Sequence, residues 1–125
     1  MAKVTLDNLA AEVGKMLDEY ADEVTDNVKE ATHKVALLTV RALQSESRQA
    51  VNGKKYYRGW RTYSETTRLS QKETIYNSKL PGLPHLLEYG HALRNGGRTA
   101  ARIHIAPVEA EAEKMMTQEL EARLK

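Results

Sequence analysis

Three side chains within one short stretch, His85, Glu88 and His91, are the residues best suited to metal or acid–base chemistry. Imidazole and carboxylate groups bind catalytic zinc, which activates a water molecule for hydrolysis. A helical zinc site, however, needs histidines four residues apart and a third ligand. His85 and His91 are six residues apart, with Gly90 between them. We therefore expect no metal ion. A metal-assisted hydrolase ranks below the two other functional hypotheses, which are given below.

His104 has an unusual setting, because isoleucine flanks it on both sides. The alternation of Ile103, His104 and Ile105 predicts a strand over 102–106. Neighbouring side chains of a strand point to opposite faces, so we expect the imidazole to pack or hydrogen-bond at a surface. The sequence contains no Gly-x-Ser-x-Gly elbow and no recognisable arrangement of Ser, His and Asp. We therefore predict neither an enzyme nor a bound cofactor.

Gly96 and Gly97, followed by Arg98, suggest a phosphate-binding loop only by their composition. A Walker loop needs Gly-x-x-x-x-Gly-Lys-Ser/Thr before a helix, and a dinucleotide loop needs Gly-x-Gly-x-x-Gly after a strand. The stretch "RNGGRTAAR" matches neither pattern and leads towards a predicted strand. We interpret 91–101 as a flexible loop with a tight turn at 95–97.

A basic and aromatic stretch carries the strongest signal for a polymeric partner. Its basic residues are Arg48, Lys54, Lys55, Arg58, Arg61, Arg68 and Lys72, and its aromatic residues are Tyr56, Tyr57, Trp60 and Tyr63. Only one acid, Glu65, lies among them. Cationic groups beside aromatic platforms suit nucleic acid, so a nucleic-acid-binding hairpin at 54–72 is the alternative function. Its candidate DNA-facing residues are Lys54, Lys55, Arg58, Arg61 and Arg68.

Two other interpretations of this stretch remain open. One is a half-buried hairpin with inward aromatic rings and solvated charges. The other is complementarity to acidic helices, because residues 1–47 hold nine acids against five bases. We rank complementarity between subunits above direct nucleic-acid recognition, since no helix-turn-helix or RNA-binding signature accompanies the patch.

Composition limits the class of protein further. A chain of 125 residues suits one domain, over 1–125. Apolar residues make up 41%, phenylalanine and cysteine are absent, and the net charge is +2. Helix packing therefore suits the chain better than a thick sandwich of sheets, and disulfides and cysteine-based metal sites are excluded. With no signal core and no membrane-length apolar run, we expect a soluble intracellular protein.

Apolar residues recur at steps of three and four from Leu6 to Ala42, which predicts a long helix over 5–51. At about 1.5 Å per residue the part from 6 to 51 would span roughly 69 Å. Weak helix formers at Asp22 and 25–27 favour a kink there. A stripe this long must either bend back or be covered by another chain, and we favour the second hypothesis.

The rest of the chain predicts short elements and one more helix. Residues 55–78 are expected to form a β-hairpin, with strands near 56–69 and 73–77 and a turn at 70–72 or, alternatively, at 64–67. A short helix over 82–90 ends at Gly90. Pro107 opens a C-terminal helix over 107–125, packed near the sheet. The predicted class is α+β: a long, possibly kinked N-terminal helix, a small antiparallel sheet, a short helix and a C-terminal helix.

Several short motifs follow one another in a fixed order: Gly59-Trp60, then Tyr76-Asn77, then "HLLEYGHALRNGGR" and "IHIAP". The residues that carry this pattern are Gly59, Trp60, Tyr76, Asn77, His85, Leu86, Leu87, Glu88, Gly90, His91, Gly96, Gly97, Arg98, His104, Ile105 and Pro107. The ordered combination is specific, covers about residues 56–115, and resembles the Hong Kong 97 gene-product-10-like family of tailed-phage tail-completion and head–tail joining proteins. Ile103 departs from the pattern, since the family commonly has proline before the His-Ile pair.

This resemblance implies a non-enzymatic structural protein of a long-tailed virion. Such proteins form a ring at the neck, between head and tail, through which DNA passes. The implied partners are copies of the chain, neighbouring neck and tail proteins and, without sequence specificity, phage DNA; no membrane is involved. The implied location is the head–tail junction of the virion, and the host cytoplasm during assembly.

The resemblance also makes 91–101 a candidate assembly arm, partly disordered in the free subunit and ordered on docking. Gly96 and Gly97 would supply freedom, and three arginines would pair with charges on a neighbour. The full set of candidate interface residues is Trp60, Glu88, His91, Arg94, Gly96, Gly97, Arg98, Arg102 and His104.

Overall fold

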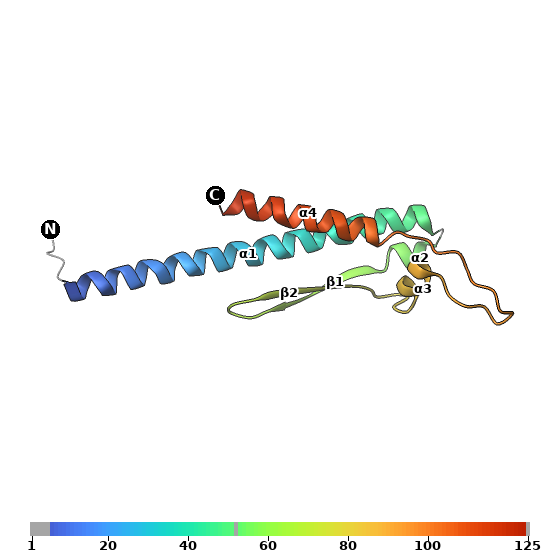
Figure 1. The fold of residues 1–125 in the computed structure, drawn as a ribbon, viewed down its shortest axis with the longest axis horizontal. Coiled ribbons are helices and arrows are strands. Elements are labelled where there is room, and N and C mark those ends of the chain that lie inside the picture. Colours follow the sequence, from blue (N-terminus) through green and yellow to red (C-terminus); the bar gives the residue numbers. More distant parts are fainter. Residues whose placement is uncertain (1–5, 52, 125) are drawn as a thin grey trace.

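A computed structural model describes residues 6–51 and 53–124 and confirms the predicted α+β class. In chain order the elements are α1 (Leu6–Ala50), α2 (Lys54–Tyr57), β1 (Trp60–Thr66), β2 (Gln71–Asn77), α3 (Leu83–Tyr89) and α4 (Ala106–Arg123). Figure 1 shows α1 running along the molecule, with α4 on one side and the hairpin on the other. No helix in the described part is long and apolar enough to span a membrane.

Helix α1 continues unbroken through the positions where a kink was expected, and Figure 1 shows no sharp bend along it. The hydroxyl of Thr25 donates to the carbonyl of Ala21 at 2.8 Å, and the Asn27 amide donates to the carbonyl of Glu23 at 3.1 Å. These polar side chains bond to the preceding turn of the helix instead of breaking it. Residue 5, the predicted first helical position, lies outside the described residues.

The hairpin is shorter than predicted, because the chain forms the helical turn α2 where the first strand was expected. The carbonyl of Gly53 accepts the N–H groups of Tyr56 and Tyr57, which closes this turn. The strands pair antiparallel from Trp60 opposite Asn77 to Thr66 opposite Gln71. The connecting turn therefore occupies 67–70, between the two predicted positions.

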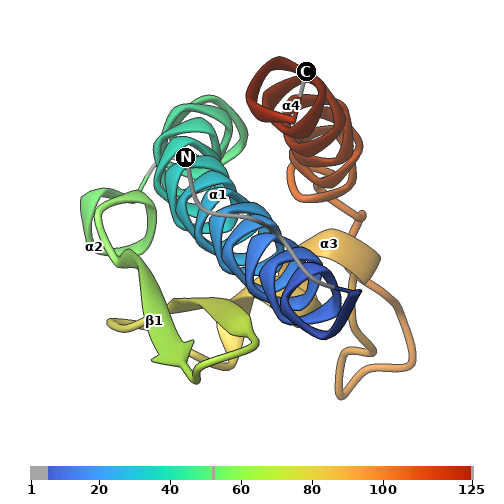
Figure 2. The same cartoon turned by 90° about the vertical axis from the view of Figure 1, so that its left-hand side faces the viewer.

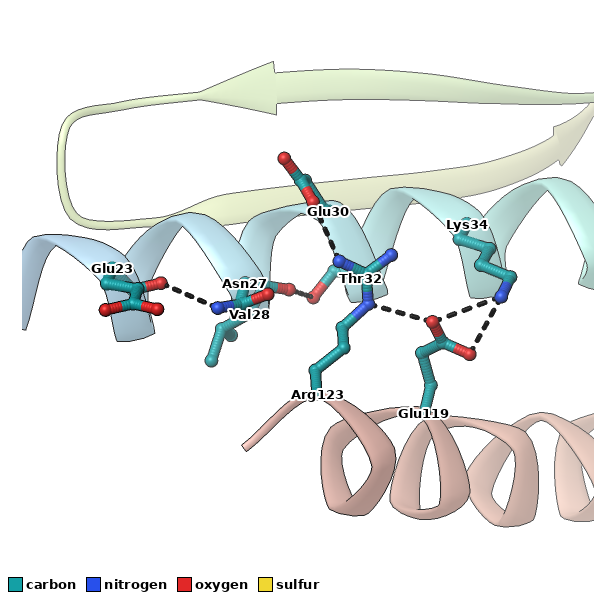
Figure 3. Close-up of polar contacts among 8 residues, drawn as sticks. All are labelled: Glu23, Asn27, Val28, Glu30, Thr32, Lys34, Glu119 and Arg123. Carbon is teal, nitrogen blue, oxygen red and sulfur yellow. Dashed lines mark hydrogen bonds and ion pairs between the residues drawn. The ribbon is translucent and has the colours of Figure 1, made fainter. Parts of the chain in front are cut away.

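Helix α4 packs along α1 and not mainly near the sheet, which corrects the predicted placement. A ladder of charged side chains joins the two helices (Figure 3). Glu119 accepts two hydrogen bonds from Lys34 and one from Arg123, and Arg123 also reaches Glu30 at 2.7 Å. Because Arg123 is the last residue of α4, this ladder fixes where α4 ends along α1.

The ends of α4 lie close to the predicted ones. Pro107 sits in the first turn, as expected for a residue without an N–H. The predicted last residue, 125, lies outside the described residues. The predicted strand over 102–106 does not form: residues 102–104 have no strand partner in the described structure, and helix α4 begins at Ala106.

The hydrophobic core is small and sits at the C-terminal end of α1. Leu43, Tyr56, Trp60 and Val108 form its buried centre, drawn from α1, α2, β1 and α4. The rings of Tyr56 and Trp60 meet edge to face with centroids 5.7 Å apart. Viewed along α1, Figure 2 shows α4 and the α2–β1 segment on different sides of the long helix. The first half of α1 therefore lies far from the core.

Candidate assembly surfaces

Glu88 lies inside the molecule, where it holds the start of α4. Its carboxylate accepts the backbone N–H groups of His104, Ile105 and Ala106 at 2.8, 3.0 and 2.9 Å. No Ser, Thr, Asp or Asn stands at 103–106 to cap α4 locally, so a distant carboxylate takes that place. Burial raises the pKa of the Glu88 carboxyl, but the three N–H donors outweigh it and the net pKa is lowered.

His104 is fully buried, and its predicted position at a surface is wrong. Its Nε2 lies 2.6 Å from the Tyr56 hydroxyl and its Nδ1 lies 2.7 Å from the carbonyl oxygen of Arg102. Burial and the charge of Glu88 raise the pKa of Tyr56 to about 12, so the hydroxyl stays protonated and can donate to Nε2. Because the chain is not a strand here, the expected placement of the two isoleucines inside and the histidine outside does not occur, and Ile103 is 64% exposed.

The other motif residues also hold the fold. The Trp60 indole donates to the hydroxyl of Ser47 at 2.7 Å inside the core. Asn77 donates to the carbonyl of Tyr56, and its side-chain oxygen accepts the N–H of Leu80. A Cβ at Gly59 would clash with the Asn77 side chain. Trp60 is therefore a core residue in the subunit, although we predicted it as an interface residue from sequence.

The loop over 91–101 is a narrow, hydrogen-bonded projection and not an irregular segment. Ala92 and Arg98 form a bridge, Thr99 donates its N–H to the carbonyl of His91, and Gly96 turns the chain with φ of 91°. The Thr99 side chain also contacts the backbone and Nδ1 of His91. Figure 1 shows the loop pointing away from the body beyond α3.

The arginines of this projection face solvent. Arg94, Arg98 and Arg102 are all exposed. The Arg98 guanidinium contacts the carbonyl oxygens of Tyr89 and Gly90 at 3.4 Å each. In the described part of the chain none of the three arginines forms an ion pair with a carboxylate. The loop therefore offers positive charge to a partner without an internal counter-ion.

His85, Glu88 and His91 do not converge. Glu88 points inward to the start of α4, His85 stacks near Tyr89 with ring centroids 5.2 Å apart, and His91 contacts Thr99. Within residues 6–51 and 53–124, no group of three His, Cys, Asp or Glu side chains is arranged to hold a metal ion.

A second cluster joins a serine, a carboxylate and a histidine. Glu73 contacts Nδ1 of His33 at 2.8 Å and accepts the Ser64 hydroxyl at 2.9 Å. A hydrolytic triad needs the imidazole next to the hydroxyl, but here the carboxylate stands between them. Burial alone would raise the pKa of Glu73, but hydrogen bonds from four neighbours have the larger effect and lower it to about 2. These neighbours are His33, Thr62, Gln71 and Ser64. The cluster fixes the hairpin against α1.

The basic and aromatic stretch does not form one surface. Tyr56 and Trp60 are buried at 1% and 3% exposure, so they cannot stack on a nucleotide base. Lys54 and Lys55 lie on α2, and Arg68 lies in the hairpin turn at the other end of the strands. The predicted stacking platform is therefore divided by the fold.

One part of that stretch remains together, and we call it the arginine surface. It surrounds a pocket of about 470 Å³ and consists of Gln44, Ser45, Arg48, Tyr57, Arg58 and Arg61. The guanidinium groups of Arg48 and Arg58 lie 5.8 and 5.9 Å from the centre of the Tyr57 ring. Arg61 donates to the carbonyl oxygens of Arg58 and Trp60 at 2.7 Å each. The sequence analysis included Arg48 in the basic stretch but not among the DNA-facing candidates, and the fold brings it from α1 to Arg58 and Arg61.

The first half of α1 carries an exposed row of apolar side chains, which we call the free stripe. Its members are 46–66% exposed; they are Leu9, Val13, Met16, Leu17 and Tyr20. The stripe is uncovered because α4 ends opposite Glu30, as Figure 3 shows. Figure 1 shows α1 extending beyond both α4 and the hairpin turn. Isolated exposed apolar residues are ordinary, whereas contiguous exposed apolar patches are typical of contact surfaces.

An open apolar groove of about 580 Å³ lies between α1, α4 and the hairpin. Val35, Leu43, Ile75, Val108 and Met116 are among its lining residues, and its titratable members are Tyr76, His85 and Glu109. The groove has few polar groups to fix a reacting molecule, so its chemistry suits apolar contact.

Comparison of this chain with protein-family models, curated proteins and solved structures finds no match. In the described structure the exposed arginines without a carboxylate partner and the free stripe lie on the outside, whereas His104, Tyr56 and Glu88 at the core contact one another. This arrangement suits binding between macromolecules.

Proposed function

We propose that this chain is a structural virion protein of a long-tailed bacteriophage. It acts as a tail-completion or head–tail joining component and assembles as a ring at the neck. The observation that carries the proposal is the free stripe: α1, a helix of 45 residues, extends beyond α4 and the hairpin, the described elements that cover its other half. An apolar row left exposed on this half of the helix is available to contact another chain.

The ordered motif over 56–115 supports the class of protein. Its residues resemble those of the gene-product-10-like family, and several of them have contacts that hold the fold: Glu88 caps α4, and Asn77 packs against Gly59. The projecting arm at 91–101 supports contact with neighbouring neck or tail proteins, since Arg94, Arg98 and Arg102 present charge there. The resemblance further supports a ring with DNA in its lumen.

The alternative, a nucleic-acid-binding protein, is favoured by one specific observation. Arg48, Arg58 and Arg61 are exposed around one pocket and form no ion pair among the residues that the structure covers. Against it stands the burial of Tyr56 and Trp60. Fluorescence anisotropy with labelled duplex and single-stranded DNA separates the two proposals, because phosphate binding weakens steeply with salt.

Electron microscopy tests the principal proposal directly. Antibodies against the purified chain should label the head–tail junction of tailed particles released from cells that carry the gene. The purified chain should also form closed rings with a central channel. Particles that carry no label at the neck, together with a chain that never closes into rings, would contradict the proposal.

A further inference from the structure

The first half of α1 combines its apolar stripe with strong negative charge. Residues 9–26 contain six acids and one base, a formal charge of −5. Glu12, Glu19 and Glu23 follow one another at steps of seven and four, so they form one row along the helix. This row borders Met16 and Tyr20, which lie three or four positions away. The free stripe therefore has one acidic edge.

The opposite end of the subunit carries the opposite charge. Residues 41–61 contain six basic residues and one acid, a formal charge of +5. The arginine surface lies in this segment, and the contacts of its guanidinium groups with Tyr57 and with backbone carbonyls hold them in place. Leu37, which is 46% exposed, lies in one row with Arg41, Gln44 and Arg48 at steps of four, three and four. An exposed apolar side chain therefore lies on the same side of α1 as the arginine surface, about two helical turns away.

We propose that the acidic, apolar first half of α1 docks on the arginine surface of a second copy of this chain. The two surfaces carry opposite charges, and both combine charged with apolar side chains. The two surfaces of one subunit cannot contact each other, because both lie on or against the same unbroken helix, near its two ends. This contact is heterologous, so each copy donates one surface and accepts another, as ring closure requires. The inference rests on the proposed ring and names the contact that closes it.

Nucleic acid is the other polyanion that suits three arginines. The observations favour the helix, because the same chain displays an acidic row next to an uncovered apolar stripe, and a duplex would leave that stripe exposed. Tyr57 is half-buried beneath Arg48 and Arg58, so its ring face is not free for a base. DNA binding at this surface is accordingly an outcome that the test must separate.

Charge reversal on each surface tests the contact with the full chain. The acidic row is reversed by Glu12→Lys with Glu19→Lys, and the arginine surface by Arg58→Glu with Arg61→Glu. Each double variant alone places like charges against each other and should weaken self-association about tenfold or more, measured by analytical ultracentrifugation. Mixing the two variants should restore association, since each then meets an opposite charge on the other. Circular dichroism verifies that both remain folded.

A matched control lies on the same helix. Asp18→Lys with Asp22→Lys makes the same change of charge, but these two residues lie on the side of α1 away from the free stripe. This control should associate nearly as the parent does, apart from a uniform electrostatic effect that salt screens.

The outcomes separate the inference from the proposed ring. Restoration by mixing, with the control unaffected, supports the contact. A parent that forms rings while both reversed variants also form them overturns the inference and leaves the ring standing. Variants that fail both alone and when mixed also overturn it, as does an Arg58→Glu, Arg61→Glu variant that loses duplex DNA binding but still self-associates. A parent that stays monomeric at high concentration overturns the ring and the contact together.

Discussion

The two halves of α1 share one helix and a similar apolar spacing but have opposite surroundings. In the second half, Ala31, Val35, Leu43 and Ser47 are at most 7% exposed, because α4, the hairpin and α2 cover them. In the first half, the side chains of the free stripe are about half to two-thirds exposed. The periodicity of a helix shows which residues share a side, but only the partner elements determine whether that side is buried.

The same contrast holds for the polar groups. Around the second half of α1, the carboxylates of Glu73 and Glu88 are nearly buried and fully engaged by donors. Around the first half, carboxylates such as Glu12 and Glu19 face solvent. The second half therefore determines the stability of the subunit, and we expect the first half to determine its association. The following predictions test that division, from the largest expected effect on unfolding to the smallest.

Glu88→Ala should cause the largest loss of stability. Removal of the carboxylate leaves three backbone N–H groups at the start of α4 without their acceptor, inside the molecule. We expect the free energy of unfolding to fall by about 3 kcal/mol or more, measured by urea denaturation at low protein concentration. Glu113→Ala, an exposed position on α4, is the control and should change it by about 0.5 kcal/mol or less. Equal effects of both substitutions would refute the capping role of Glu88.

Glu73→Gln should destabilise the subunit by about 1.5 kcal/mol at neutral pH, because a charged acceptor of several hydrogen bonds is lost. The pKa of Glu73 is about 2 in the folded chain against an ordinary value of 4.5. A lowered pKa stabilises the fold above the unfolded value and loses that contribution as pH falls from 4.5 towards 2. The difference between parent and variant should therefore shrink over this interval. A difference that is constant from pH 6 to pH 2.5 would exclude this mechanism.

Trp60→Phe should cost about 1 kcal/mol or more, because the buried Ser47 hydroxyl loses the indole N–H donor and the smaller ring fills the core less well. Ser47→Ala in the same background removes the unpaired hydroxyl and should cost little more. The coupling between the two substitutions, obtained from a double-mutant cycle of unfolding free energies, measures this hydrogen bond. Strictly additive effects would mean that Trp60 acts by packing alone.

Leu17→Ser should have the smallest effect on the subunit itself. Leu17 is 62% exposed, so the unfolding free energy at low concentration should change by about 0.5 kcal/mol or less. Self-association at high concentration should nevertheless weaken, as measured by light scattering. A large loss of subunit stability would mean that the first half of α1 is covered within its own chain, and would remove the contrast on which these predictions depend.

Local signals in the sequence were sufficient for α1, α3 and α4, but not for the short helix α2, where a strand was expected. The three- and four-residue spacing in α1, Pro107 in the first turn of α4 and Gly90 at the end of α3 each act within a turn or two of the chain. The predicted strand around His104 failed because the N–H groups of 104–106 bond to Glu88, sixteen to eighteen residues away. A proline-led helix with no local cap was the one available sign of such a distant acceptor.

The sequence alone therefore determined the class of fold, the length of α1 and the opposite charges of its two ends, because spacing and charge are properties of the chain itself. Tertiary structure decided which residues are buried and which are brought together. It buried Tyr56, Trp60 and His104, brought Arg48 beside Arg58 and Arg61, and ended α4 opposite Glu30. Burial and pairing depend on contacts between segments far apart in sequence, and no local pattern specifies where those segments meet.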